Sequence, residues 1–145
     1  MPQDMEAILE LQVSVFEGEQ KIPSELICSP GDNFLQWWCA LEETNIVGAV
    51  AAWHENGQVH WGRFAVDPKC RGHQIGTRLA RFSLEDLFSR GFDEIYMEAR
   101  EVTVKIICGM GGTVAGEPTK FYEGTITPVT VTRNNYFFKR RHWKQ

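Results

Sequence analysis

The chain has 145 residues, 43% of them hydrophobic and 23% charged, which fits one globular domain and excludes a disordered chain or a coiled coil. No apolar run approaches the ~18 residues that a membrane-spanning helix needs, and the acidic N-terminus does not resemble a signal peptide. Residues 1–132 hold ten basic and nineteen acidic side chains, whereas residues 133–145 hold five basic ones and no acid, so a dedicated duplex-DNA-binding protein is also disfavoured.

The first half of the chain predicts one helix, a loop and a three-stranded meander. Residues 4–16 are amphipathic and follow Asp4, a suitable helix cap, whereas residues 17–33 are polar and indicate a loop or a broken short helix. Asn56-Gly57 is a strong signal for a two-residue turn, because both central positions of a type I′ turn need positive φ. The three strands expected here are Phe34–Leu41, Ile46–Trp53 and Gln58–Val66.

The rest of the chain predicts helices alternating with strands. A broad apolar stripe indicates a helix near 75–90, which Gly91 can end. The pattern then predicts a strand at Glu94–Ala99, a short helix at Val102–Met110, and two strands within Lys120–Tyr136 that bend at Pro128. This order predicts an α/β (α+β) fold, with a mixed, mostly antiparallel central sheet and helices on both faces, in a single domain over residues 1–145.

The segment most typical of a binding function is Phe64–Arg78, with the sequence FAVDPKCRGHQIGTR. A strand ends, Pro68 stops its pairing, and a glycine-containing loop leads into a helix. The free amides and the dipole of a helix N-terminus bind phosphate or pyrophosphate, and Gly72 and Gly76 allow a close backbone approach. The segment is neither a Walker A loop nor a GxGxxG loop after a first strand. An ordinary strand–helix turn is the alternative interpretation.

In its context this segment resembles the acetyl-CoA loop of the GNAT superfamily of N-acetyltransferases. The similarity lies in Val66-x-Pro68 followed by RGHQIGTRL at residues 71–79, in VSVFEGEQ at residues 13–20, and in the order of elements. It covers roughly residues 4–112. The resemblance implies a GNAT-like fold and direct acetyl transfer from acetyl-CoA to the amine of a small molecule or protein, with no metal.

The resemblance also assigns the cofactor-binding residues. The strand that ends at Val66 is expected to pair with the pantetheine arm of CoA, a backbone N–H near Phe64–Val66 to polarise the acetyl carbonyl, and the loop amides to hold the pyrophosphate. The full set expected to bind the cofactor is Phe64, Ala65, Val66, Arg71, Gly72, His73, Gln74, Ile75, Gly76 and Thr77.

Two positions depart from the family pattern. Gln74 stands where the first glycine of the loop usually occurs, and its Cβ narrows the approach to a phosphate. The family often has a tyrosine on its last helix that protonates the leaving thiolate, and Ile107 occupies that position here. These departures support the alternative that the chain is a non-catalytic CoA-binding or regulatory domain.

The candidate catalytic residues are His60 and Glu98. By strand register, His60 lies where some members of the family place a glutamate base, and histidine readily exchanges a proton near neutral pH. Glu98 is a second candidate on the next strand. Either residue could instead be structural, with His60 lining the sheet and Glu98 pairing with a nearby arginine. Possible acids are Tyr96, Cys108 and Tyr122.

Several further expectations concern partners and location. The four tryptophans Trp37, Trp38, Trp53 and Trp61 are expected in the core or on a sheet face, with direct contact to substrate as the alternative. The cysteines lack CxxC spacing, so reduced thiols in the cytoplasm are expected, without structural zinc. We expect no membrane partner, a possible homodimer, and no nucleic acid, although the basic tail leaves an RNA-directed enzyme or adaptor as a third hypothesis.

Overall fold

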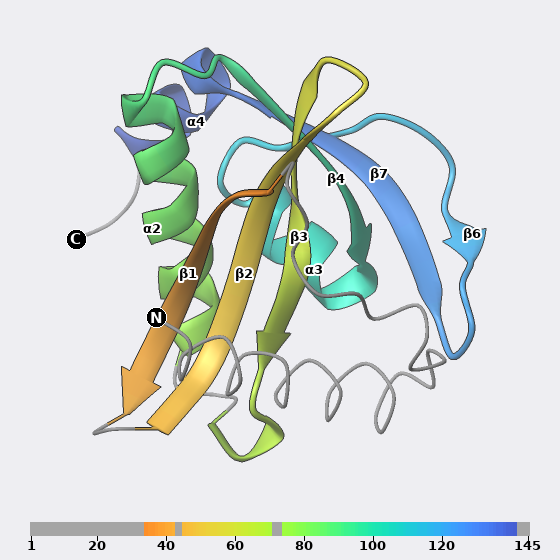
Figure 1. Ribbon diagram of the computed structural model, residues 1–145. Coiled ribbons are helices and arrows are strands. Elements are labelled where there is room, and N and C mark those ends of the chain that lie inside the picture. Colours follow the sequence, from red (N-terminus) through yellow and green to blue (C-terminus); the bar gives the residue numbers. More distant parts are fainter. Residues whose placement is uncertain (1–33, 43–44, 71–73, 142–145) are drawn as a thin grey trace.

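The computed structural model describes residues 34–42, 45–70 and 74–141. The helix predicted over residues 4–16 and the loop predicted over residues 17–33 lie outside this part of the chain. Figure 1 shows a twisted sheet with helices packed behind it. The elements, in chain order, are β1 (Phe34–Glu42), β2 (Asn45–Glu55), β3 (Gln58–Val66), a 3₁₀ turn (Pro68–Cys70), α2 (Ile75–Ser89), β4 (Glu94–Arg100), α3 (Glu101–Cys108), β5 (Thr113–Val114), β6 (Thr119–Lys120), β7 (Thr125–Thr132) and α4 (Arg133–Arg140).

The strands form one mixed sheet in the order β1-β2-β3-β4-β7-β5, with β6 also paired to β7. The meander of β1, β2 and β3 is antiparallel, and Asn56 and Gly57 have φ values of 53° and 78°, which confirms the predicted tight turn. β3 and β4 are parallel because α2 connects them, whereas the other described pairs are antiparallel. The predicted mixed, mostly antiparallel sheet is therefore confirmed.

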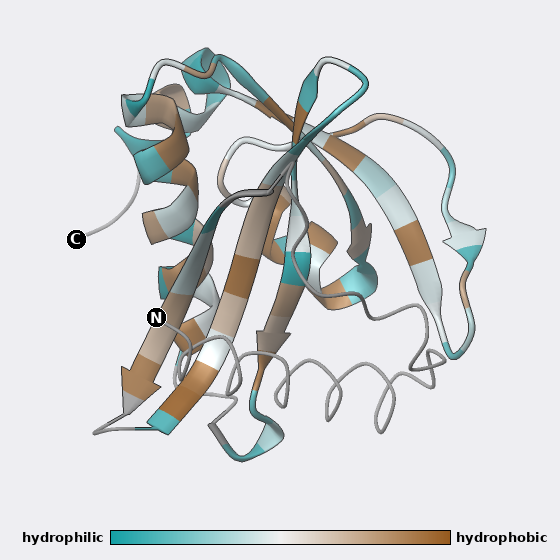
Figure 2. Ribbon diagram, in the orientation of Figure 1, coloured by the Kyte–Doolittle hydropathy of each residue, from teal (hydrophilic) through white to brown (hydrophobic). Residues whose placement is uncertain are grey.

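The described helices share one hydrophobic core with one face of the sheet. Alternate residues of β2, β3, β4 and β7 point into this core, as the two-residue period of a strand requires. Leu84 and Leu87 of α2 are fully buried there, and Trp61 of β3 donates to the buried Ser83 hydroxyl at 2.8 Å. Figure 2 shows apolar residues along β2, whereas the β2–β3 hairpin is hydrophilic. Residues 54–58 of this hairpin are exposed, so the core ends before the turn.

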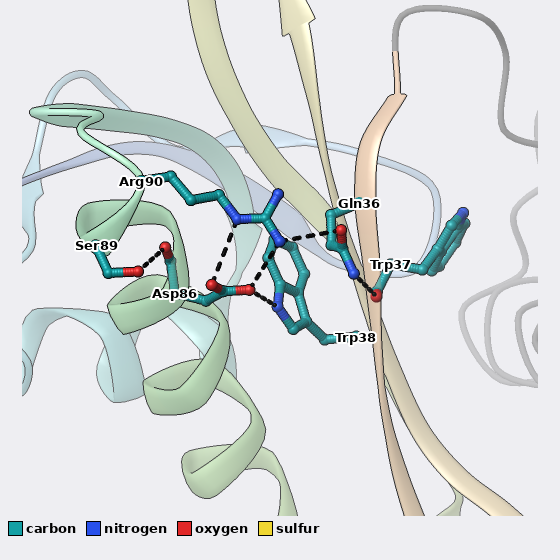
Figure 3. Close-up of polar contacts among 6 residues, drawn as sticks. All are labelled: Gln36, Trp37, Trp38, Asp86, Ser89 and Arg90. Carbon is teal, nitrogen blue, oxygen red and sulfur yellow. Dashed lines mark hydrogen bonds and ion pairs between the residues drawn. The ribbon is translucent and has the colours of Figure 1, made fainter.

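A polar network joins α2 to the edge strand β1 (Figure 3). The carboxylate of Asp86 accepts a hydrogen bond from Trp38 Nε1 at 2.8 Å and forms an ion pair with Arg90 at 3.1 Å. Arg90 also donates to Gln36 Oε1 at 3.1 Å. Because Trp38 is only 5% exposed, its indole N–H needs this partner, and the network fixes the C-terminal half of α2 against the sheet.

The C-terminal prediction was partly wrong. The segment Lys120–Tyr136 was predicted to form two strands with a bend at Pro128. It contains instead the last residue of the short strand β6, all of the long strand β7 and the first turn of α4. Pro128 lies inside β7 opposite Glu98, and its carbonyl accepts from Ala115 N at 2.8 Å. The backbone of Pro128 faces the side of β7 on which β5 and β6 pair. β5 pairs with β7 at residues 129–130 and β6 pairs with it at residues 125–126, so the missing N–H of Pro128 interrupts neither pairing.

The aromatic residues of α4 were predicted to belong to a strand, because the contacts that make them helical come from residues distant in the sequence. Tyr136 is fully buried, donates to Glu85 Oε2 at 2.8 Å and contacts the Phe88 ring at 5.5 Å. Thr132 caps the helix by accepting from Asn135 N at 3.2 Å. The predicted helix at Val102–Met110 is confirmed with shifted bounds, as α3.

Candidate functional site

The most unusual feature of the sheet is the separation of β3 from β4. Their register pairs are Val59 with Ile95 and His60 with Tyr96, and the two strands then diverge. Figure 1 shows the two strands moving apart toward their C-terminal ends, and we call the unpaired stretch between them the opening. An extended ligand can pair with the β3 backbone in such an opening, by the same main-chain hydrogen bonds that a neighbouring strand would make.

A β-bulge re-aims β3 inside the opening. The register with β2 shifts between Ala49 and Ala51, and Arg63 has a φ of 57°, a left-handed conformation that is uncommon for arginine. As a result, Trp61 and Phe64 point to the same side, with their ring centroids 5.1 Å apart. Bulges of this kind concentrate at functional sites. Sequence reasoning missed this bulge, although Gly62, an isolated glycine inside the strand, is a signal for one.

The N-terminus of α2 lies at the open end, because the chain enters α2 shortly after β3 ends. Gln74 is the capping residue with a left-handed φ of 62°, and its side chain makes no capping hydrogen bond. The first turn also contains no acidic residue. The backbone amides of Ile75, Gly76 and Thr77 therefore retain the capacity of a helix N-terminus for an anion.

Gly76 permits a close contact between α2 and β3. A Cβ atom at Gly76 would lie 3.2 Å from Phe64 Cζ and 3.6 Å from a methyl group of Val66. The missing side chain thus serves helix–strand packing, in addition to the expected approach to a phosphate. The structure brings Phe64 and Val66 of the predicted set against the first turn of α2. Arg71, Gly72 and His73 lie outside the described residues.

On the face opposite α2, three rings from neighbouring strands form a row that we call the aromatic row: Trp53, His60 and Tyr96. Trp53 is the register partner of His60, and their rings stack with centroids 5.8 Å apart. His60 is in turn the register partner of Tyr96, with ring centroids 5.0 Å apart. The row therefore ends at the point where β3 and β4 begin to diverge.

The imidazole of His60 presents an unused polar atom. Its Nε2 is buried, and no described residue forms a hydrogen bond with it. A buried nitrogen without a partner is costly in a purely structural role, whereas a proton-accepting group needs an open position of this kind. The catalytic role of His60 stays a prediction, and this open nitrogen is the geometric feature on which it depends.

Glu98 lies two residues beyond Tyr96 on the same face of β4. Tyr96 Oη donates to Glu98 Oε2 at 3.2 Å, and the Glu98 side chain is exposed. Burial raises the pKa of Tyr96, and the neighbouring Glu98 carboxylate raises it further, so the phenol keeps its proton. The predicted pair His60 and Glu98 is therefore brought to one face, with Tyr96 between the two residues.

The structure also describes the other sequence candidates. Ile107, at the position of the family tyrosine, is fully buried in the core. Cys108 is half-buried near the end of α3, and Tyr122 is exposed in the β6–β7 turn. Trp61 and Trp38 are core residues, whereas Trp37 and Trp53 lie on the face opposite α2, and Trp53 is the one that stacks on His60.

Comparison with known proteins gives a family match. Residues 5–105 match the model of the acetyltransferase (GNAT) family. A search of curated proteins finds no match to the chain. Within the part of the chain that the structure describes, no helix has the length and apolar character required to cross a bilayer.

Solved structures share the fold at low sequence identity. ElaA from Escherichia coli aligns with a TM-score of 0.79 and 21% identity, over 90% of this chain and 91% of its own. An acyl-CoA N-acyltransferase from Pseudomonas aeruginosa aligns at 0.79 and 17%, over 91% and 92%. An aminoglycoside 6'-N-acetyltransferase complexed with coenzyme A aligns at 0.71 and 15%, also over 91% and 92%.

Proposed function

Because the chain belongs to the GNAT acetyltransferase family, we propose that it transfers an acetyl group from acetyl-CoA to a primary amine of a small molecule or protein by direct attack. The observation that carries this proposal is the opening between β3 and β4, with the uncapped N-terminus of α2 at its wide end. A similar fold solved in complex with coenzyme A supports the choice of co-substrate.

The described residues suit two parts of a CoA molecule, the pantetheine arm and the pyrophosphate. Beyond His60 the backbone of β3, including Phe64, Ala65 and Val66, would hold the pantetheine arm, and one of these amides would polarise the thioester carbonyl. The amides of the first turn of α2 would hold the pyrophosphate, with the residues at 71–73 completing the loop. Acetyl-CoA would supply an activated acyl group whose thiolate can leave.

The acceptor amine needs help to lose a proton. A lysine-like amine with a pKa of about 10.4 costs ~4.6 kcal/mol to hold neutral at pH 7, at ~1.36 kcal/mol per pKa unit. We assign His60 as the residue that accepts this proton, because its buried Nε2 lies at the start of the opening without a described partner. Glu98 is the alternative candidate for this role on the same face.

The position of the family tyrosine holds no proton donor here, because Ile107 at that position is buried and apolar. In the proposed reaction CoA therefore leaves as a thiolate, without a proton donor at that position.

Cys39 and Cys108 are free thiols, which supports a reducing compartment, and we place the protein in the cytoplasm.

A charge reversal at the α2 N-terminus tests the proposed CoA site. Thr77→Glu places a carboxylate in the first turn, where the helix dipole favours it by about 0.3–1 kcal/mol. The same carboxylate would repel the pyrophosphate and compete for its amides. We expect unchanged or higher thermal stability, together with CoA binding at least ~10-fold weaker by isothermal titration calorimetry, which corresponds to ~1.4 kcal/mol.

Thr119→Glu is the matched control, because it adds the same charge on the exposed strand β6. This control should bind CoA like the wild type. Equal CoA affinity in both variants would remove the α2 N-terminus from the site. CoA binding without thiol release across a broad panel of amines would instead support a non-catalytic CoA-binding domain.

A further inference from the structure

The aromatic row continues into a carboxylate at the mouth of the opening. Trp53, His60 and Tyr96 lie side by side on β2, β3 and β4, and Glu98 follows Tyr96 on the same face. The three rings are half-buried, so each buries one side and leaves part of its surface accessible. This face is therefore both aromatic and anionic, and it adjoins the residue that we assign as the base.

Such a combination recognises cations. The face of an aromatic ring attracts an ammonium group, and the attraction grows as the site loses water. Glu98 accepts one hydrogen bond from Tyr96, and a carboxylate has further acceptor positions for an ammonium group. The hydrogen bond also orients the carboxylate toward the ring that would contact the same cation.

The nearest cationic side chain on β4 is directed elsewhere. Arg100 is an even-numbered residue of β4, like Tyr96 and Glu98, so the alternation of the strand places it on their face. Its guanidinium nevertheless donates to the Phe121 carbonyl at 2.9 Å and lies 5.1 Å from the centre of the Phe121 ring. These contacts hold the positive charge at the β6–β7 turn. Among the residues that the structure describes, the ion pairs involve the acids Asp86, Asp93 and Glu85 and do not include Glu98.

We propose that the acceptor carries a second positive charge a few carbons from its reacting amine, as alkyl diamines and polyamines do, an inference that rests on the function proposed above. The reacting amine would lie at His60, and the second ammonium group would lie over Tyr96 against Glu98. The site would thus select its substrate by the charge of a group that takes no part in the reaction.

Matched acceptors test the proposal directly. Diaminopropane, diaminobutane and diaminopentane are compared with propylamine, butylamine and pentylamine in a thiol-release assay at saturating acetyl-CoA. We expect kcat/KM to be at least ~10-fold higher for the best diamine than for its monoamine, with most of the difference in KM, because a desolvated cation–π contact supports an effect of this order.

The two carboxylates that flank Tyr96 provide a variant and its control. Glu98→Gln should reduce the diamine-to-monoamine ratio to about 2-fold or less, because it removes the charge beside the second ammonium group. Glu94→Gln removes an equal charge from the same strand, on the side of Tyr96 where β3 and β4 are still paired. It should leave the ratio of the wild type intact.

Binding provides a second readout that does not need turnover. Calorimetric titration of diaminobutane and butylamine into CoA-saturated protein should show the same preference. Binding of diamines without thiol release would support this site while refuting the proposed catalysis. Two outcomes would overturn the inference and leave the transferase proposal standing. One is an equal kcat/KM for each diamine and its monoamine, and the other is a diamine-to-monoamine ratio that Glu94→Gln lowers as much as Glu98→Gln does.

Discussion

The Trp53 ring of the aromatic row occupies space beside Gly62 that any larger residue would fill with its Cβ atom. A Cβ atom at Gly62 would lie 2.9 Å from Trp53 Cη2 and 3.4 Å from Trp53 Cζ3. Carbon atoms prefer separations of about 3.5–4.0 Å, so Gly62→Ala should displace the indole ring by roughly 0.5–1 Å. Because this ring stacks on His60, the imidazole loses the neighbour that orients it.

The expected cost differs between stability and catalysis. Loss of the ring contact should lower the free energy of unfolding by about 0.5–1.5 kcal/mol. A catalytic group misplaced by ~1 Å can lower the rate about 100-fold, so we expect kcat for acetyl transfer to fall roughly 10- to 100-fold. CoA affinity should change by less than about 2-fold, because such a side-chain shift leaves the β3 backbone and the α2 N-terminus in place.

A double-mutant cycle separates the steric mechanism from other effects of the added methyl group. Thiol release, CoA titration and urea unfolding are measured for Gly62→Ala, for Trp53→Leu and for both changes together. In the Trp53→Leu background the methyl group meets no indole, so it should cost much less than in the wild type. An equal loss of kcat in both backgrounds would refute this reasoning.

Three further predictions concern the scaffold. Asp86→Ala leaves the Trp38 indole N–H without an acceptor and should lower the free energy of unfolding by about 1–3 kcal/mol in urea, whereas Asp86→Asn, which keeps an acceptor oxygen, should lose less. Leu84→Ala empties a fully buried position and should cost about 2–5 kcal/mol, and a cost below ~1 kcal/mol would contradict the close packing of α2. Burial, and then the hydrogen bond and charge of Glu85, raise the pKa of Tyr136, so the folded chain keeps a proton that the unfolded chain releases near pH 10. The free energy of unfolding should therefore fall as the pH rises above ~10. Urea unfolding at several pH values should show a shallower fall in Tyr136→Phe, which has no phenol to titrate.

Local signals in the sequence predicted the meander and the helices α2 and α3. Asn56-Gly57 specifies its turn through φ alone, and the apolar stripe of α2 specifies the face that meets the sheet. The aromatic residues around Tyr136 were assigned to a strand, because their helical packing depends on Glu85 and Phe88, which lie far away in the sequence. Propensity gives way to tertiary contacts there.

The candidate site was predictable only in part for the same reason. His60 and Glu98 were identifiable as chemistry-bearing residues, and both lie on one face of the sheet. The ring contacts of His60 with Trp53 and Tyr96 depend on strand register, and the parallel pairing of β3 with β4 follows only from the packing of α2. The left-handed Arg63 arises from the bulge. The isolated Gly62 beside it is a sequence signal for a bulge, but that signal does not say which neighbouring residue adopts the left-handed conformation.

The brief pairing of β3 with β4 also affects how the chain folds. The meander β1–β3 closes through neighbouring hairpins, whereas β4 pairs with β7 across an intervening helix and two short strands. Few main-chain hydrogen bonds connect these two units, so side chains of the shared core must hold them together. The units are therefore expected to act as separate cooperative blocks in amide hydrogen exchange, with the β3 amides that face the opening exchanging long before either block unfolds.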